Sequence, residues 1–493
     1  MLKIKGTVLG KSHPDTLTSM NNLAIALEKQ GKFAEAEAMH RQTLQLRETV
    51  LGKDHPETLA SMNNVAESCR LQGKYAEAGV MHRQTLQLRK TVLGKDHSDT
   101  LASMNNVAES LRLQGKYAEA GVMHRQTLQL RETVLGKNHL VTLASMSNLA
   151  IALENQGKYT EANAMHLQTL QLRETVLGKD RPDTLASMNN VAELLLLQGK
   201  YAEAEALHQQ TLQLRETVLG KSHPDTLTSM NNLALALEKQ GKFAEAEAMH
   251  RQTLQLRETV LGKDHPDTLT SMNNLAIALE KQGTFAKAES MHQQTLQLRE
   301  AVLGKNHPDT LASMNNLAIV LANQGKYAKA EAMHRLTLQL METVLGNDHP
   351  ETLASMNNLA VALRLQGKCA EARVLHRQTL KLTETALGEG HPDTLASMSN
   401  LAIALEKQGK FIEAEAMHRQ TLQLRETVLR KNHPDTLASM NNVAESLRLQ
   451  GKYGEAEAMH RQTLQLRETV LGKSHPDTLA SMNNVAESCR LQG

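Results

Sequence analysis

The sequence predicts an all-α fold, a solenoid of stacked antiparallel helix pairs, from three observations. One 42-residue phrase recurs without insertions along the whole chain. Each copy contains two stretches whose apolar residues follow the three- and four-residue steps of an amphipathic helix. No stretch alternates apolar and polar residues as a half-buried strand does. The copies begin at His13, His55, His97, His139, Arg181, His223, His265, His307, His349, His391, His433 and His475.

The first element of each copy is a predicted helix, which lies between Pro14 and Gly31 in the copy that begins at His13. Pro14 suits the first helical turn, where its missing N–H costs nothing, and Asp15 favours the positive end of the helix. Gly31 ends the helix. The apolar stripe of this helix consists of Leu17, Met20, Leu23, Ala24 and Leu27.

The second element is a longer helix, which follows the turn at Gly31 and ends at Gly52. Two helices joined by a tight turn form an αα-hairpin, and its apolar faces are buried only when neighbouring hairpins stack. The stripe of the second helix consists of Phe33, Ala36, Met39, His40, Thr43, Leu44, Val50 and Leu51.

The repeat frame divides the chain into three parts. Residues 1–12 match the tail of a second helix, residues 13–474 hold eleven complete repeats, and residues 475–493 hold the first helix of a twelfth. Solenoids need polar capping repeats, and none is visible at either end of the sequence. We therefore expect a fragment or an incomplete gene product.

The composition narrows the class of partner and the compartment. The formal net charge is only +2, which disfavours nucleic acid or an anionic membrane as partner. The sequence contains no apolar run long enough to span a bilayer, and its start lacks the apolar core of a signal peptide. Cys69, Cys369 and Cys489 are far apart and odd in number, which indicates a reducing compartment. The expected location is the cytoplasm.

The repeat resembles a known family. Ala24, Leu27, Gly31, Phe33, Ala36 and Leu44 have the identities and spacing of a tetratricopeptide repeat (TPR). The 42-residue form with HPDT, NNLA, QGKF and ETVLGK resembles the kinesin light chain type. Long arrays of near-identical units also resemble the sensor regions of fungal NOD-like receptor proteins, which carry an NB-ARC domain. The chain departs from both, because it contains neither sustained heptads nor a G-x-x-x-x-G-K-S/T phosphate loop.

The resemblance implies a right-handed superhelix whose concave groove binds a peptide or a protein. The repeats differ mainly at the positions of Thr18, Ile25, Glu28 and Lys29, which share a face of the first helix with Asn21. In TPR proteins the matching positions line the groove. Glu67 and Arg70 are expected to pair at i,i+3, an exposed pair that a partner could displace. The residues predicted to give specificity are Glu28, Lys29, Arg70, Leu71, Arg112, Leu113, Glu238, Lys239, Glu280, Lys281, Arg364 and Arg448.

A column of asparagines follows the same face. Because an amide offers two donors and an acceptor, it matches one peptide backbone unit. The alternative is a hydrogen bond to the neighbouring repeat, which we favour for the second column, Asn22, Asn64 and their equivalents. Replacing Asn231, Asn273 and Asn315 by alanine is expected to weaken a partner and to leave melting intact. The predicted binding column is Asn21, Asn63, Asn105, Asn189, Asn231, Asn273, Asn315, Asn357, Asn441 and Asn483.

Catalysis and metal binding are disfavoured by the repetition itself. The 22 histidines form two columns, at the positions of His13 and His40. Their spacing does not bring several of them together around one metal ion. We expect His40 to pack in the core and His13 to cap a helix. Cys69 and Cys489 replace a core leucine and are expected to be apolar fillers. An active site gathers its groups once, whereas most polar residues here recur in nearly every repeat, so no enzyme and no cofactor is predicted.

The predicted function is a protein–protein interaction scaffold, acting as the recognition region of a larger signalling protein. The alternative is a cargo adaptor of a microtubule motor, similar to a kinesin light chain.

Overall fold

The computed structural model describes residue 5 and residues 7–491. Within these residues the fold consists of twenty-three α-helices, labelled α2 to α24, and contains no strand, so the all-α prediction is confirmed. The predicted helix remnant at residues 1–12 lies partly outside the described residues; within them, the Leu9 amide donates to the Lys5 carbonyl across 2.8 Å, as in a helical turn.

The two helices of each repeat alternate along the chain. The first helices are α2 (Pro14–Glu28), α4 (Pro56–Leu71), α6 (Ser98–Leu113), α8 (Leu140–Asn155), α10 (Pro182–Leu197), α12 (Pro224–Lys239), α14 (Pro266–Lys281), α16 (Pro308–Asn323), α18 (Pro350–Leu365), α20 (Pro392–Glu406), α22 (Pro434–Leu449) and α24 (Pro476–Arg490). The second helices are α3 (Phe33–Leu51), α5 (Tyr75–Leu93), α7 (Tyr117–Leu135), α9 (Tyr159–Leu177), α11 (Tyr201–Leu219), α13 (Phe243–Leu261), α15 (Phe285–Val302), α17 (Tyr327–Val344), α19 (Cys369–Leu387), α21 (Phe411–Leu429) and α23 (Tyr453–Val470).

A histidine caps the first helix of most repeats. The Nδ1 atom of His13 accepts the backbone N–H of Asp15 across 3.2 Å, while Pro14 takes the first helical position. The predicted capping role of the His13 column is therefore confirmed. The first helix of the repeat that begins at Arg181 has no such side-chain bond.

A glycine ends the first helix of each complete repeat through a backbone motif. Gly31 has a φ of 74°, and its N–H donates to the Glu28 carbonyl across 2.9 Å. The N–H of Lys32 then reaches the Leu27 carbonyl across 3.0 Å. These bonds satisfy carbonyls that the helix end would leave unpaired and reverse the chain within a few residues. The two helices of the repeat are thereby held antiparallel.

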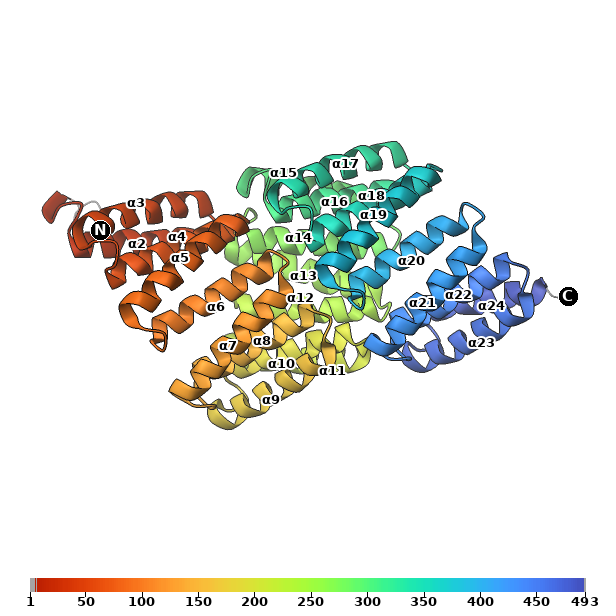
Figure 1. Cartoon of the computed structure of the whole chain (residues 1–493), viewed down its shortest axis with the longest axis horizontal. Coiled ribbons are helices and arrows are strands. Elements are labelled where there is room, and N and C mark those ends of the chain that lie inside the picture. The colour runs from red at the N-terminus through yellow and green to blue at the C-terminus, as the bar shows by residue number, and fades with distance from the viewer. Residues whose placement is uncertain (1–4, 6, 492–493) are drawn as a thin grey trace.

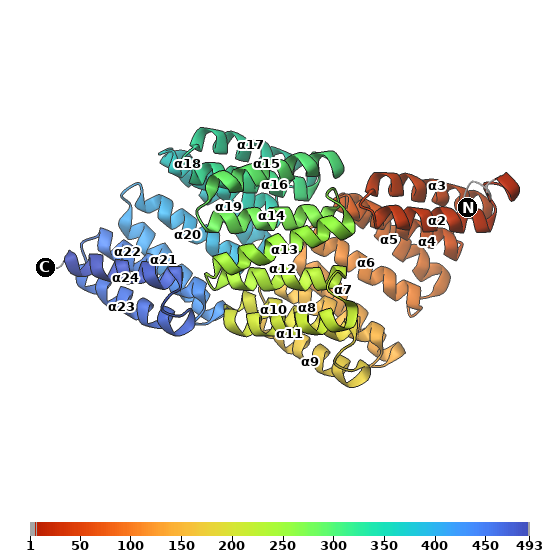
Figure 2. The same cartoon turned by 180° about the vertical axis from the view of Figure 1, so that it is seen from behind.

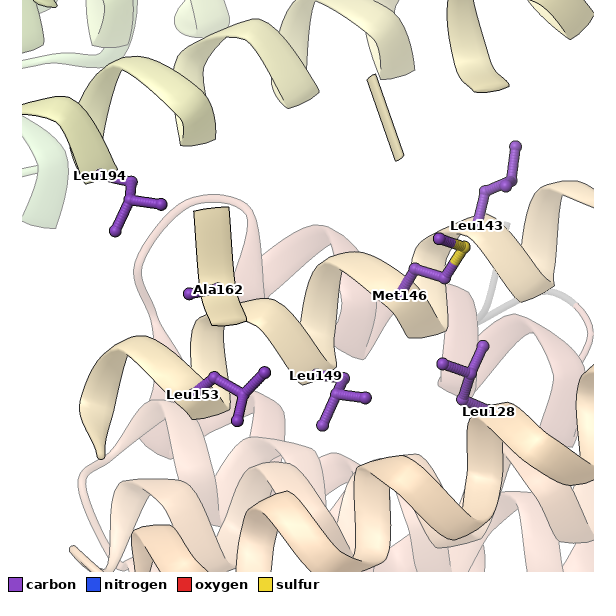
Figure 3. Packing of buried hydrophobic residues seen from close by; sticks show 7 residues of the cluster. All are labelled: Leu128, Leu143, Met146, Leu149, Leu153, Ala162 and Leu194. Carbon is purple, nitrogen blue, oxygen red and sulfur yellow. The ribbon is translucent and has the colours of Figure 1, made fainter. Parts of the chain in front are cut away.

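The hydrophobic core runs along the array between consecutive hairpins. In one section, side chains from α7, α8, α9 and α10 form a single cluster, shown in Figure 3. Burying a leucine of this kind stabilises the fold by roughly 1.5–3 kcal/mol. Because each cluster needs residues of neighbouring repeats, the hairpins stack. The cluster consists of Leu128, Leu143, Met146, Leu149, Leu153, Ala162 and Leu194.

A buried arginine near the end of the second helix joins it to the next repeat. The Arg257 Nη1 atom donates to the Asp267 carbonyl across 2.8 Å and to the Ser271 hydroxyl across 2.9 Å. Arg257 is only 6% exposed, and burial lowers the pKa of its guanidinium. The burial of this arginine column was not predicted from the sequence, because an arginine near a helix end is usually a surface residue.

The hairpins coil into a superhelix whose two ends lie at opposite ends of the long axis (Figures 1 and 2). First helices of neighbouring repeats, such as α16 and α18 or α18 and α20, contact one another directly. Since elements on the inside of a curved stack lie closer together, the first helices form the inner, concave side. The second helices form the outer side.

Candidate functional site: the concave face

The concave face is built from side chains of the first helices. Asparagines at its base form a ladder between repeats: the Asn64 amide nitrogen donates to the Asn21 side-chain oxygen across 2.6 Å, and Asn274 donates to Asn231 across 2.8 Å. The second column thus binds the preceding repeat, as expected. The same bond occurs for Asn106 with Asn63, Asn148 with Asn105, Asn232 with Asn189, Asn316 with Asn273 and Asn484 with Asn441.

These bonds occupy the oxygen of the first column, which the sequence assigns to partner binding. Asn189, Asn231, Asn273 and Asn315 are 8–9% exposed. The Asn357 amide nitrogen instead donates to the Ser397 hydroxyl across 2.7 Å. Where an asparagine is bonded in the ladder through its oxygen, its NH₂ group remains to meet a partner, except at Asn189, whose NH₂ group donates to Glu193. Peptide binding by this column stays a prediction.

The Glu/Arg positions form local ion pairs. The Arg70 Nε atom donates to Glu67 across 2.8 Å, as predicted, and the equivalent bond joins Arg112 to Glu109 and Arg448 to Glu445. Arg112 also reaches the Asn155 side chain of the next repeat across 3.3 Å. The guanidiniums are therefore positioned before any partner arrives.

In four repeats the glutamate at the position of Glu28 lies beside the buried histidine of the same hairpin. Glu154 lies 2.9 Å from His166 Nε2 and Glu238 lies 3.2 Å from His250 Nε2. Glu28 also accepts a hydrogen bond from the Ser68 hydroxyl in the next repeat. In these repeats a carboxylate on the concave face thus contacts a histidine that is buried inside the hairpin.

Other repeats leave the buried histidine without a carboxylate. Burial lowers the pKa of His82, His124, His208, His292, His334 and His376 to about 4. A neutral imidazole with a mostly apolar environment fits the expected packing role of the His40 column.

Glu193 is the exception on the concave face. Its carboxylate accepts from the amides of Asn189 and Asn232, at 2.9 and 2.8 Å, and its side chain stays exposed. Leu196 replaces the arginine that neutralises Glu67, so the described structure gives Glu193 no ion pair. The helices around the carboxylate desolvate it even though part of the side chain reaches solvent, and this desolvation, with Glu154 nearby, raises the pKa of Glu193. Glu193 is not among the site residues predicted from the sequence, although the change from an apolar residue to glutamate at this position is visible there.

Glu280 is a second concave carboxylate with a raised pKa, which burial causes. It accepts from the Asn323 amide across 2.9 Å, and the neighbouring Lys281 is exposed. Lys29 and Lys239 are exposed as well. This face therefore combines carboxylates with exposed lysine side chains.

A cavity of about 310 Å³ opens on the concave side of the last repeats. It is lined by Asn441, Glu445, Arg448, His460, Asn484 and Glu487. The lining is polar, and its arginine is already paired with Glu445. Such a cavity suits a polar side chain of a partner better than an apolar one.

One group in the described chain has the spacing of metal ligands, namely Glu37, Cys69 and Glu77. Cations of the protein already occupy its surroundings, because Arg41 binds both glutamates and Lys74 binds Glu37 across 2.8 Å. Burial raises the pKa of the Cys69 thiol to about 12. The group is therefore an ion-pair network around a thiol that stays protonated.

Three further observations concern the whole chain. Cys69, Cys369 and Cys489 are free thiols. None of the helices in the described part of the chain combines the length and the apolar character that crossing a bilayer requires. No curated protein sequence matches the chain.

Solved structures with similar helical arrangements include a protein of nearly identical TPR-like repeats, a kinesin light chain candidate of Podosopora anserina. It is 28% identical over 42% of this chain and 99% of its own, with a TM-score of 0.36. BtubC of P. vanneervenii is 21% identical over 46% of this chain and 90% of its own (TM-score 0.38). Yeast Tom70 is 13% identical over 97% of this chain and 96% of its own (TM-score 0.46).

The family comparison covers nearly the whole sequence. Tetratricopeptide-repeat models match residues 4–49, 15–91, 57–133, 99–175, 142–217, 183–259, 225–301, 267–341, 309–385, 365–427 and 436–477. These matches agree with the paired helices, the glycine turns and the small residues between them. The chain belongs to the tetratricopeptide-repeat family, whose arrays are interaction scaffolds.

Proposed function

We propose that this scaffold holds an extended segment of a partner protein along its concave face, and that the segment carries a lysine or arginine opposite Glu193. The packing residues are nearly constant from repeat to repeat, whereas the concave positions change between Glu/Lys, Arg/Leu and apolar pairs. A surface that varies on a constant frame is suited to recognition.

The observation that carries the proposal is the state of Glu193. Two neutral amides hold its carboxylate in place at 2.8 and 2.9 Å, and no guanidinium or ammonium forms a direct ion pair with it in the described structure, where Arg215 acts on its charge only from a distance. A cationic side chain of a partner would supply the missing charge and form charge-assisted hydrogen bonds. The NH₂ groups of the asparagine column, apart from that of Asn189, and the side chains of Lys239 and Lys281 would contact the rest of the segment.

A peptide library displayed against the immobilised chain tests this proposal. We expect selected peptides to contain a lysine or arginine at a fixed position. Glu193→Gln should then weaken them by about tenfold or more, because a hydrogen bond to a charged group contributes roughly 1.5–3 kcal/mol. Glu245→Gln, an exposed carboxylate at the start of α13 on the outer side, is the matched control. Equal losses in both variants, or selected peptides without a cation, would contradict the proposal.

For the setting, we favour the recognition region of a larger signalling protein in the cytoplasm; the three free thiols support a reducing compartment. The 42-residue light chain type of repeat supports the alternative, an adaptor for motor cargo. Sequencing single full-length transcripts separates the two: an adjoining phosphate loop supports the signalling protein, and adjoining heptads support the adaptor.

A further inference from the structure

Consecutive turns of the superhelix touch along a line that we call the seam. Here the start of a first helix meets the end of the first helix six repeats earlier, as where α14 meets α2 (Figures 1 and 2). The histidine Nε2 atom lies 2.9–3.3 Å from a backbone carbonyl. The pairs are His265–Lys29, His307–Leu71, His349–Leu113, His391–Asn155, His433–Leu197 and His475–Lys239.

One neutral imidazole serves both contacts. The Nδ1 atom of His349 accepts the N–H of Glu351 across 3.2 Å and so caps its own helix. The proton is then on Nε2, which donates to the Leu113 carbonyl across 3.0 Å. His349 is 7% exposed, whereas His55, His97 and His139, which have no earlier turn beside them in the described chain, are exposed.

Glycine is required on the other side of the seam. A Cβ atom on Gly73, Gly115 or Gly199 would lie 2.1–2.3 Å from the Cδ atom of Pro308, Pro350 or Pro434. Gly325, Gly367 and Gly409 have the same backbone conformation, with φ of 76–83°, yet no described atom comes within 4 Å of a Cβ built there. The turn after the first helix thus needs glycine in every complete repeat because its φ is positive. At the seam it needs glycine also because a Cβ atom would collide with a proline of the next turn.

No cluster of buried hydrophobic residues in the described chain spans two turns. The ring of Tyr117 stacks on His391, with centroids 6.4 Å apart. Burial, with Asp393 of the later turn nearby, raises the pKa of Tyr117 to about 12. Cavities of about 480, 540 and 640 Å³ remain between the turns. The seam therefore lacks the continuous apolar packing that joins neighbouring repeats.

We propose that the seam is a separable clasp: the array exchanges between a closed coil, in which the turns touch, and an open coil, in which the turns part while every hairpin stack remains. Stacking between neighbours holds a repeat array together by itself. Single hydrogen bonds, glycine–proline contacts and the Tyr117–His391 ring stack hold the turns, and these contacts break before the stacking between neighbouring repeats. This inference is independent of any partner.

Two triple variants test the clasp in the full chain. The seam variant carries Gly73→Ala, Gly115→Ala and Gly199→Ala; the control carries Gly325→Ala, Gly367→Ala and Gly409→Ala. Both sets suffer the same φ strain, and only the first set collides with a proline of the next turn. In small-angle X-ray scattering we expect a larger radius of gyration for the seam variant only, with equal helical circular dichroism in both. Equal radii, or loss of helix in the seam variant alone, would overturn the proposal.

A second pair of variants avoids strained glycines. Asparagine also caps helices but is too short to bridge the turns, so His307→Asn, His349→Asn and His391→Asn should open the coil. His55→Asn, His97→Asn and His139→Asn remove histidines that cap without a seam contact in the described chain, and they should leave the scattering unchanged. Identical scattering of both sets would show that these bonds do not hold the turns.

Discussion

The side-chain nitrogen of Asn274 donates to the side-chain oxygen of Asn231, one repeat earlier, across 2.8 Å. The residue that the sequence assigns to a partner is therefore also the acceptor for its neighbouring repeat. A loss of binding after replacing Asn231 has two possible causes, and stability must be measured beside affinity.

The first prediction concerns this ladder. Because each single replacement leaves a partly buried amide without its partner, Asn231→Ala and Asn274→Ala should each lower the free energy of unfolding by about 1 kcal/mol. The double variant should lose clearly less than the sum of both, since one bond is broken only once. Urea unfolding of the unmodified protein, the two single variants and the double variant measures these differences in the free energy of unfolding. This result would replace the expectation from sequence that melting is unaffected.

The control for the ladder is Asn190→Ala. The preceding repeat has Ser147 in place of the acceptor asparagine, so no amide is available to Asn190 at that position. We expect a smaller loss of stability than for Asn274→Ala. Equal losses would mean that the amide bond contributes nothing specific.

The second prediction uses a natural variation in the buried arginine column. Arg257 donates to the Ser271 hydroxyl across 2.9 Å, whereas Met341 takes the arginine position beside Ser355, whose buried hydroxyl has no partner in the described structure. Ser271→Ala should cost about 1.5–3 kcal/mol, because a charged donor loses its acceptor. Ser355→Ala should be neutral or stabilising. Chemical unfolding of both variants checks the difference, and a reversed order would contradict it.

The third prediction is a loss of stability in acid. Burial keeps the pKa of six core histidines, His82 among them, at about 4, against an unfolded value of roughly 6.5. Above the unfolded value both states are neutral. As the pH falls from about 6.5 to about 4, the unfolded chain binds protons that the folded chain does not, so stability decreases. Melting temperatures across this range should fall steadily.

A single substitution tests the cause. His376 Nε2 is buried without a partner in the described structure, and Arg364 contributes to lowering the pKa of this histidine, after burial. Arg364→Glu should give it a carboxylate, as Glu154 does for His166 across 2.9 Å, and should raise the pKa of His376. An NMR titration of the ring protons reads this value directly. An unchanged pKa would show that position 364 does not reach the imidazole.

The fold could be predicted from the sequence because its determinants are local. The pattern of Leu17, Met20 and Ala24, the cap at His13 and the turn at Gly31 all lie within one 42-residue unit, and repetition made them visible many times. The pairing of Glu67 with Arg70 was predictable for the same reason, since three residues separate them on one helix.

The seam and the arginine column could not be predicted in this way. His349 and Leu113 are 236 residues apart, and their contact depends on the pitch of the superhelix, which accumulates over six repeats. No local pattern distinguishes a histidine that only caps from one that also bridges two turns. Likewise, Arg257 is buried only because the next hairpin covers it. The acceptor role of the first asparagine column also depends on the exact rotation between neighbouring repeats.

The fourth prediction concerns Arg430, which replaces the glycine that ends the other second helices of this length. Its φ is 79° and its ψ is 163°, whereas Gly388 has 93° and 161° at the equivalent position. This backbone region is open essentially only to glycine, and holding another residue there costs on the order of 1–3 kcal/mol. Arg430→Gly should therefore raise the free energy of unfolding. Because glycine also adds conformational entropy to the unfolded chain, which offsets part of the relieved strain, we expect a net gain of about 1 kcal/mol. Thermal and urea unfolding measure the gain.

Lys431→Gly, one residue further along the same exposed loop, is the control and should give no gain. A destabilised Arg430→Gly would mean that contacts of the arginine side chain outweigh its strained backbone.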